Sequence, residues 1–170
     1  MIENKSRALG AKFIAILLMG TYLLSPIFAS AATVAFNPQY IISDEEMQST
    51  ANWTTADIQK FLQDRGSYLA TLTTADYNGQ IKPASQIIQE ASQQYQVNPK
   101  YILVTLQKEQ SLVTDDTPTQ KQLDWAAGYG VCDSCSMDDP KVIKFKGFGK
   151  QVDNAAGIIR WYYNNTSHSV

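Results

Sequence analysis

The sequence predicts a mainly α-helical domain that follows a signal peptide. Two observations predict the helical class: several segments carry apolar residues at helical spacing, and no segment shows convincing strand alternation or an internal repeat. A third observation is size, because a chain of 170 residues suits one ordinary domain. We therefore expect a single helical domain over residues 54–170.

The charge balance and the residue counts restrict the chemistry. The net charge is -2 and charged residues make up 18% of the chain, which does not suit a basic nucleic-acid binder. The one histidine is His168, so the sequence lacks the histidines that a histidine-based nucleophile system or a histidine-rich metal site would need. We expect no metal, no cofactor and no nucleic-acid partner, which leaves carboxylates and two cysteines for any chemistry.

Residues 1–31 have the three parts of a secretory signal peptide. Basic residues precede an apolar run over residues 13–29, and the small residues Ala29-Ser30-Ala31 follow it. The alternative is an uncleaved membrane anchor, but the run is short and contains Pro26. We expect cleavage after Ala31, membrane contact only during export, and a monomer that is secreted or held in the cell envelope.

The elements of the mature chain can be assigned in order. Residues 32–53 are expected to be an extended lead-in, and a capping-box pattern at Thr54 and Asp57 begins a helix that Gly66 ends. A polar stretch over residues 67–82 contains an Asn78-Gly79 turn. Further helices are expected at residues 84–95, 101–113 and 151–164, and the N-cap residue Asn98 with the first-turn Pro99 begins the second of these. A short helical candidate at 119–127 and an irregular, functional loop precede residue 150.

Glu109 is the carboxylate best placed for chemistry. Its spacing from Ile102, Leu106 and Val113 puts it at the edge of the apolar stripe of the third helix. A carboxyl group partly removed from water has a raised pKa and can act as a general acid. The alternative is an ordinary surface pair with Lys108.

Three segments resemble one known family. Residues 98–111 are similar to the catalytic helix of soluble lytic transglycosylases of the lysozyme-like superfamily, in which an apolar helix ends in glutamate followed by serine. Residues 147–151 resemble that family's Gly-Leu-Met-Gln segment, and residues 154–162 resemble its next helix. Residues 146–149 also resemble the Asn-Phe-Phe-Gly-like segment of the glucosaminidase branch. The matches keep their order over residues 84–164, so the fold they imply is lysozyme-like.

The sequence departs from the family pattern at three places. Gln110 separates Glu109 from Ser111, and one extra residue separates Gly149 from Gln151. The family's later tyrosine-bearing helix has no counterpart before the last residue, so either Tyr162 or Tyr163 replaces its tyrosine or the chain is a fragment of a longer protein.

The resemblance implies an exported bacterial domain that cleaves the β-1,4 glycan strands of peptidoglycan. Glu109 would be the general acid/base of a lytic transglycosylase, or of a muramidase or glucosaminidase. The substrate-binding residues implied are Gln110, Ser111, Tyr129, Phe148, Gln151 and Tyr162. A separate hydrolytic base would come from Asp115, Asp116, Asp124, Asp133, Asp138 or Asp139. Five aromatic residues could line a sugar groove, although core packing is the more common role of such residues: Trp125, Tyr129, Phe148, Trp161 and Tyr162.

A second class of function uses the same fold. A catalytically inactive lysozyme-like module would bind peptidoglycan or support a cell-surface structure. The two hypotheses differ in whether Glu109 is catalytic.

Cys132 and Cys135 form a C-x-x-C pattern within the irregular loop. In an exported protein we expect them to form a disulfide that braces the loop opposite Glu109. A zinc site would need two further ligands, and a thioredoxin-like role would need the motif to open a helix after a strand.

Overall fold

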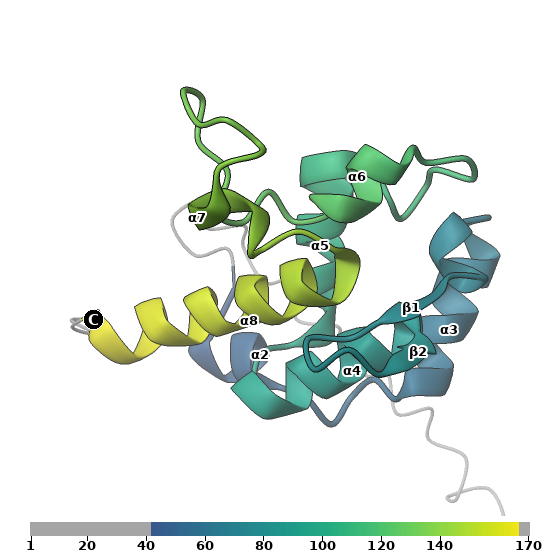
Figure 1. Cartoon of the computed structure of the whole chain (residues 1–170). Helices are drawn as coiled ribbons and strands as arrows, with labels where there is room; N and C mark the ends of the chain where they lie inside the picture. Colours follow the sequence, from purple (N-terminus) through teal and green to yellow (C-terminus); the bar gives the residue numbers. More distant parts are fainter. Residues whose placement is uncertain (1–41, 167–170) are drawn as a thin grey trace, which may run out of the picture. The chain divides into compact units, whose positions relative to one another are not determined.

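A computed structural model of the chain describes residues 42–166. The predicted signal peptide, residues 32–41 of the predicted lead-in and residues 167–170 lie outside these described residues. The described part is mainly helical, as the sequence predicts (Figure 1). Its helices are α2 (Asp44–Gln48), α3 (Thr55–Asp64), α4 (Ala84–Tyr95), α5 (Pro99–Gln110), α6 (Gln120–Asp124), α7 (Pro140–Ile143) and α8 (Phe148–Asn165).

Helix α2 corrects part of the predicted lead-in, which was expected to be extended. The Ser43 side chain caps this helix by accepting a hydrogen bond from the backbone N–H of Glu46, at 3.0 Å. Three acidic residues occupy its first turn, where they complement the helix dipole. Asn98 then fixes α2 to the domain, because its backbone N–H and side-chain amide donate to the carbonyls of Met47 and Glu46 at 2.7 and 2.8 Å.

Helix α3 begins where the capping box predicts. The Thr54 side chain accepts from the Asp57 N–H, and the Asp57 carboxylate accepts from the Thr54 N–H at 2.9 Å. Ile58 and Leu62 are fully buried on one face. Gly66 follows the helix with a φ of +66°, a conformation that suits glycine.

A small β-hairpin replaces the strand-free polar stretch that the sequence led us to expect. After a 3₁₀ turn at Tyr68–Ala70, strands β1 (Thr73–Ala75) and β2 (Ile81–Pro83) pair antiparallel. The expectation was wrong because strands of three residues are too short to display alternation. The Asn78-Gly79 turn is confirmed, with Gly79 at a φ of +84°.

Helices α4 and α5 form the centre of the fold. The Asn98 side chain caps α5 by accepting from the Lys100 N–H at 3.0 Å, and Pro99 occupies the first turn, as predicted. The helix ends at Gln110 rather than at Val113, because Ser111 takes a left-handed conformation with a φ of +60°. Leu112 and Val113 are still buried, but beyond the helix end.

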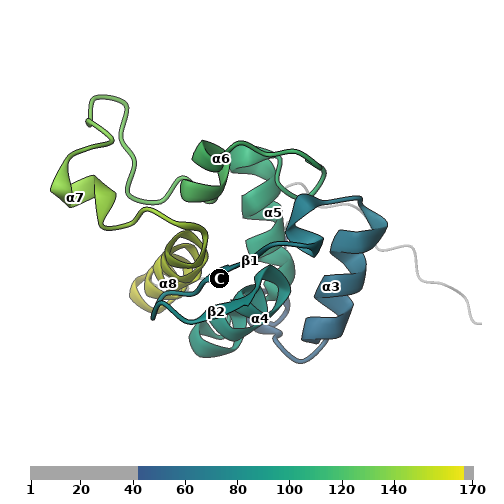
Figure 2. The ribbon, with the colours of Figure 1, turned by 45° about the vertical axis from the view of Figure 1, so that its right-hand side comes forward.

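Helix α8 packs mainly against α4 and closes the core (Figures 1 and 2). It begins at Phe148, three residues before the predicted start. The buried apolar core is drawn from α3, α4, α5 and α8, with Leu106, Val152 and Ile88 each fully buried. Burying such a side chain contributes about 1.5–3 kcal/mol to folding. Over residues 42–166, no helix is both long enough and apolar enough to cross a bilayer.

Candidate active site

Glu109 lies in the last turn of α5. Its side chain keeps 36% of its surface exposed, which is more than the edge of an apolar stripe led us to expect. Among the described residues, the cation that pairs with it is Lys108, whose Nζ lies 3.3 Å from Glu109 Oε1. The carboxylate faces the loop that follows α6, where Gly128 lies against it.

Gly128 forms the surface against which the Glu109 carboxylate rests. It has a φ of +65°, and a Cβ atom at this position would lie 3.1 Å from Glu109 Oε2. That separation is tighter than ordinary van der Waals contact, so a side chain here would press on the carboxylate. Glycine is therefore favoured at position 128 both by the left-handed backbone conformation and by the close approach of the Glu109 carboxylate.

An open cleft of about 530 Å³ lies in front of Glu109. Its walls come from the end of α5, from α6 and from the loop on both sides of the disulfide. The lining residues are Glu109, Gln110, Lys121, Gln122, Trp125, Gly128, Val131 and Met137. Glu109 is thus the acidic residue of this cleft, and Lys121 is its basic residue.

Gln122 joins the two helices that form the cleft. Its Nε2 donates to the carbonyl of Gln110 at 3.1 Å and to Asp115 Oδ2 at 3.0 Å. The same side chain completes a capping box with Thr119 at the start of α6. One residue therefore fixes α6 against the turn in which Glu109 sits.

Gln151, which the resemblance implies to be a substrate-binding residue, is not among the residues that line the cleft. It is fully buried, and its Oε1 accepts from the N–H groups of Ala127 and Tyr129 at 3.3 and 2.9 Å. Its Nε2 donates to the carbonyls of Tyr129 and Phe145 at 3.0 and 2.9 Å. The side chain has no free hydrogen-bonding group left for a sugar, and it fixes both ends of the long loop to α8.

Two further predicted substrate-binding residues lie elsewhere. Phe148 is 3% exposed and belongs to the core. Tyr162 is 53% exposed and packs edge-on against Trp161, near the C-terminal end of α8. That end of α8 points away from α6 (Figure 1), so the structure does not bring Tyr162 to Glu109. Because α8 has eighteen residues, its C-terminal end lies too far from its N-terminal end for Tyr162 to reach the cleft.

The remaining predicted residues lie near Glu109. Gln110 lines the cleft, whereas Ser111 is an exposed residue at the helix end and is not among the lining residues. Tyr129 follows Gly128 directly, and its ring packs edge-on against Phe145 with the ring centroids 5.0 Å apart. Both hydrogen-bonding groups of its backbone are used by Gln151. Tyr129 therefore borders the cleft rather than lining it.

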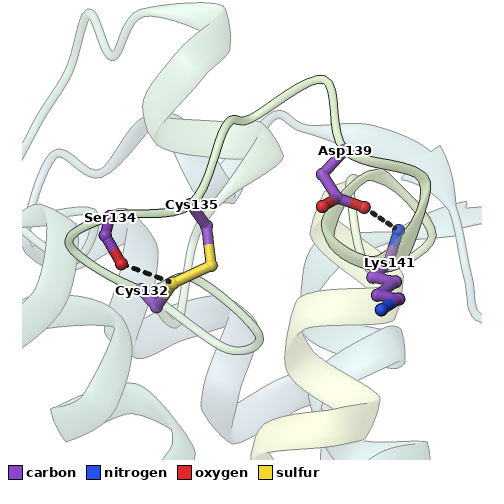
Figure 3. The surroundings of a disulfide bond; sticks show 5 residues. All are labelled: Cys132, Ser134, Cys135, Asp139 and Lys141. Atoms are coloured by element: carbon purple, nitrogen blue, oxygen red, sulfur yellow. Dashed lines mark hydrogen bonds between the residues drawn. A yellow bond between two sulfur atoms is a disulfide. The ribbon is translucent and has the colours of Figure 1, made fainter.

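The predicted disulfide between Cys132 and Cys135 is confirmed, with a Cα–Cα distance of 5.2 Å (Figure 3). It closes a tight turn in which the Cys135 N–H donates to the Cys132 carbonyl at 3.1 Å. Because Val131 and Met137 line the cleft on either side of it, the disulfide braces one wall of the cleft. Within residues 42–166 no cluster of three side chains is suited to hold a metal ion.

Several cleft residues were missed by sequence reasoning. Lys121, Gln122, Gly128, Val131 and Met137 were not proposed, although the Thr119 and Gln122 capping box is visible in the sequence. Trp125 was considered as a groove residue, and it lines the cleft while remaining only 5% exposed. No local sequence signal marks the other residues that line the cleft, because it is the path of the loop in three dimensions that brings them there.

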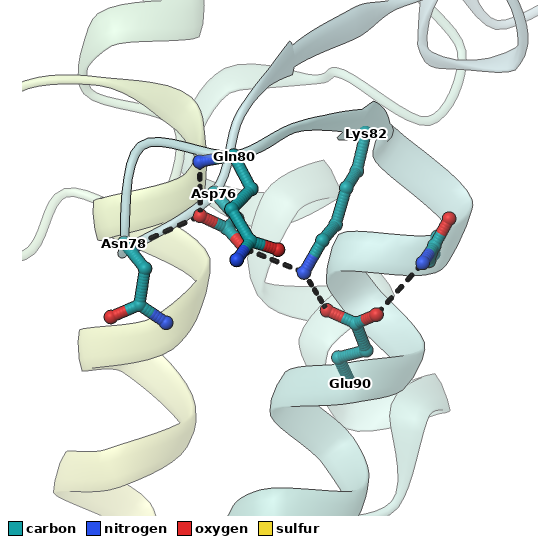
Figure 4. Close-up of polar contacts among 6 residues, drawn as sticks. Asp76, Asn78, Gln80, Lys82 and Glu90 are labelled. Carbon is teal, nitrogen blue, oxygen red and sulfur yellow. Dashed lines mark hydrogen bonds and ion pairs between the residues drawn. The ribbon is translucent and has the colours of Figure 1, made fainter.

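A second polar cluster lies beside the hairpin (Figure 4). The Lys82 Nζ lies 2.6 Å from Asp76 Oδ2 and 2.7 Å from Glu90 Oε2. This contact with Lys82 holds the pKa values of Asp76 and Glu90 below their usual range. Nearby, the Tyr95 hydroxyl donates to Asp153 at 2.9 Å, and burial raises the pKa of Asp153.

The fold and the cleft together define a small, mainly helical domain with a disulfide-braced loop and one acidic residue in an open cleft. The chain belongs to the family described as LasA, N-terminal domain, whose family model matches residues 40–168. Comparison with curated proteins and with solved structures gives no match.

Proposed function

We propose that this domain is a lysozyme-like, peptidoglycan-cleaving domain in which Glu109 is the general acid/base. The observation that carries the proposal is the position of Glu109, at the end of an apolar helix and facing a cleft of about 530 Å³. The resemblance of residues 98–111 to a transglycosylase catalytic helix adds independent support. The substrate would be the β-1,4 glycan strand of the cell wall.

The lining of the cleft suits a sugar. Gln110 and Lys121 bring polar groups that can bind hydroxyl and N-acetyl groups. Trp125, Val131 and Met137 supply apolar surface for the faces of the sugar rings. Such a mixture of a few polar groups and an apolar wall is typical of ligand sites.

The number of carboxylates favours a lytic transglycosylase over a hydrolase with a separate base. Hydrolytic mechanisms of the common kind need a second carboxylate about 5–9.5 Å from the first. None of the described aspartates proposed as a base lines the cleft, and Asp124 is paired with Lys146 at 3.4 Å. Glu109 would therefore protonate the leaving oxygen and then accept the proton of the sugar hydroxyl that attacks internally.

The proposed location is outside the cytoplasm, in the cell envelope or the surrounding medium. Disulfides persist in oxidising compartments, so the Cys132–Cys135 bridge supports this location. The predicted signal peptide would supply the route. We propose a monomer whose partner is the glycan strand.

One observation favours the alternative of an inactive wall-binding module. Glu109 is exposed and pairs with its neighbour Lys108, as an ordinary surface glutamate does. In that case the cleft would bind glycan without cleaving it.

A cell-wall clearing assay separates the two functions. Wild-type protein should clear a peptidoglycan suspension, and Glu109→Gln should reduce clearing by at least about a hundredfold, since removing a general acid typically costs 10²–10⁴-fold. The matched control is Glu45→Gln, an exposed position in α2 that is remote from the cleft lining, which should clear like wild type. Urea unfolding should place both variants within about 0.5 kcal/mol of wild type.

Two results would count against catalysis by Glu109. Equal clearing by Glu109→Gln and wild type would remove Glu109 from the reaction, and glycan binding without any clearing would support the inactive module. If the walls are cleared, mass spectrometry of the fragments identifies the branch. Anhydro ends indicate a transglycosylase and reducing ends a hydrolase.

A further inference from the structure

A second hollow, of about 440 Å³, lies beside Phe145 and is separate from the Glu109 cleft. It is lined by Tyr77, Lys144, Phe145, Lys150 and Asn154. These residues come from the hairpin turn, from the end of α7 and from the first turns of α8. We call it the Phe145 hollow.

The lining of the Phe145 hollow has two cations and no acidic residue. The Lys144 Nζ lies 4.6 Å from the centre of the Phe145 ring, and neither Lys144 nor Lys150 forms an ion pair with a described side chain. Several other lysines of the described residues are paired, including Lys60, Lys82 and Lys146. Two unpaired cations in one hollow of an acidic protein form a site that favours an anion.

Other groups in the hollow suit a ligand that is more than a bare ion. Asn154 uses its amide nitrogen to donate to the Lys150 carbonyl at 2.8 Å, which leaves its side-chain oxygen as an acceptor. Tyr77 is 54% exposed and adds a hydroxyl and an aromatic face. Together with Phe145, it gives the hollow apolar surface on which a peptide or sugar can lie.

The segment formed by Tyr129 and Gly130 separates this hollow from the Glu109 cleft. Gly128 and Val131 line the cleft, while the residues between them pack on Phe145. A Cβ atom on Gly130 would lie 2.3 Å from the Phe145 ring, so the contact between loop and ring is close. Tyr129 and Gly130 therefore link the two sites, because their neighbours line the cleft and they themselves pack on a residue that lines the hollow.

We propose that the Phe145 hollow is an anion-binding subsite for the cell-wall polymer, with Lys144 and Lys150 as the cations that bind it. The anion is a carboxylate of a peptide stem or a phosphate of a wall polymer, because lysine binds either as a point charge. The inference rests on the proposed function for the identity of the polymer. The anion preference itself rests on the lining of the hollow.

The test measures binding by calorimetric titration in the Glu109→Gln background, so that no cleavage takes place. The probes are an acidic stem peptide, a glycerol phosphate oligomer and a peptide-free wall disaccharide. We expect the peptide, the phosphate oligomer or both to bind, and the Lys144→Gln/Lys150→Gln double variant to weaken that binding about fivefold, as the loss of two exposed charge pairs predicts. The probe whose binding weakens in the double variant shows whether the natural anion is a stem-peptide carboxylate or a wall-polymer phosphate.

Lys141→Gln is the matched control, because Lys141 is exposed on α7 and is not among the lining residues. It should bind both anions as the background protein does. If neither anion binds, or if the double variant and the control bind them equally, the proposal is wrong. Disaccharide binding reports separately on the Glu109 cleft. Binding of an anion through Lys144 and Lys150, together with no disaccharide binding and no wall clearing by the protein that retains Glu109, would overturn only the proposed cleavage.

Discussion

The carboxylates of Asp76 and Glu109 are held in opposite ways. Asp76 is 8% exposed, and its oxygens accept from the N–H groups of Asn78 and Gln80, both at 2.8 Å, and from Lys82 at 2.6 Å (Figure 4). Glu109 is 36% exposed, and its carboxylate has Lys108 as its ionic partner. The first carboxylate organises a turn, whereas the second keeps oxygen lone pairs available to a ligand.

This difference teaches that a shifted pKa does not by itself mark the candidate site of this protein. Shifts occur beside the hairpin, where burial raises the pKa of Asp153 and where burial and the Asp153 carboxylate raise the pKa of Tyr95 to about 12. Another occurs at the start of α3, where hydrogen bonds from Thr54 lower the pKa of Asp57. Structural networks also perturb pKa values. The geometry of the cleft therefore identifies Glu109.

Each region also depends on a glycine, and the two glycines differ in what they contact. Gly149 of α8 lies against the backbone of the hairpin, where a Cβ atom would be 2.3 Å from the Ala75 carbonyl oxygen and 2.5 Å from the Asp76 Cα. Gly128 lies against the flexible carboxylate of Glu109. A methyl group should therefore disrupt the fold at Gly149 and the candidate site at Gly128.

Gly149→Ala should have the largest effect on stability. The atoms it meets are backbone and cannot rotate away, so the variant should lose about 3 kcal/mol of unfolding free energy, the upper end for overpacking. Urea unfolding measures the loss. The control is Gly157→Ala in the same helix, whose Cβ would meet the Tyr95 side chain at 3.2 Å. An equal loss in both variants would show that helix α8, rather than its contact with the hairpin, is sensitive.

Gly128→Ala should have a smaller effect on stability and a clear effect on function. The left-handed backbone costs a non-glycine residue about 1–2 kcal/mol, and the new methyl group displaces the Glu109 carboxylate. We expect clearing of a wall suspension to fall about tenfold or more, since small misplacements of a catalytic group are costly.

Gly66→Ala separates these two effects. Gly66 has nearly the same φ, +66°, and a Cβ atom there would meet no neighbouring atom within 4 Å. It should lose similar stability and keep its clearing activity. Equal losses of clearing in the two variants would attribute the effect to backbone strain and not to Glu109.

Local sequence signals predicted where α3 and α5 begin. The Thr54 and Asp57 capping box and the Asn98-Pro99 pair act within one turn, so three-dimensional context is not needed to read them. The short hairpin was missed because its pairing is stabilised by tertiary contacts and by the Asp76 turn. The helix at Asp44–Gln48 was missed although its Ser43 cap is local.

The candidate site was predictable only in part. Glu109 follows from helical periodicity, and the resemblance selected Gln151 as an important residue. The position of Gln151 could not be predicted because its burial arises from contacts with Ala127, Tyr129 and Phe145, which no local pattern encodes. The contact between Gly128 and Glu109 is also nonlocal, since it depends on how the loop returns to α5.

Asp153→Asn should give the smallest effect, and its sign depends on pH. Burial, with a lesser contribution from Asp76, raises the pKa of Asp153 in the folded state, so ionisation of this group opposes folding at neutral pH. Asparagine removes the charge and can still accept the hydrogen bond from the Tyr95 hydroxyl. At about pH 7 the variant should be more stable than wild type, by less than about 1 kcal/mol after solvent screening.

This advantage should disappear in acid. As the pH falls through the raised folded pKa and below the unfolded value of 3.8, wild-type Asp153 becomes protonated in both states and the cost is removed. Loss of the ionised Glu90 contact with Lys82 affects both proteins and cancels in the difference, whereas protonation of Asp76 removes its repulsion of Asp153 and so reduces the gap further. Urea unfolding across this pH range measures the gap, with Asp138→Asn at an exposed position as the charge-matched control. A gap that stays constant with pH, or that the control reproduces, would mean that Asp153 does not carry a burial cost and that the hairpin region differs from the Glu109 cleft in hydrogen bonding alone.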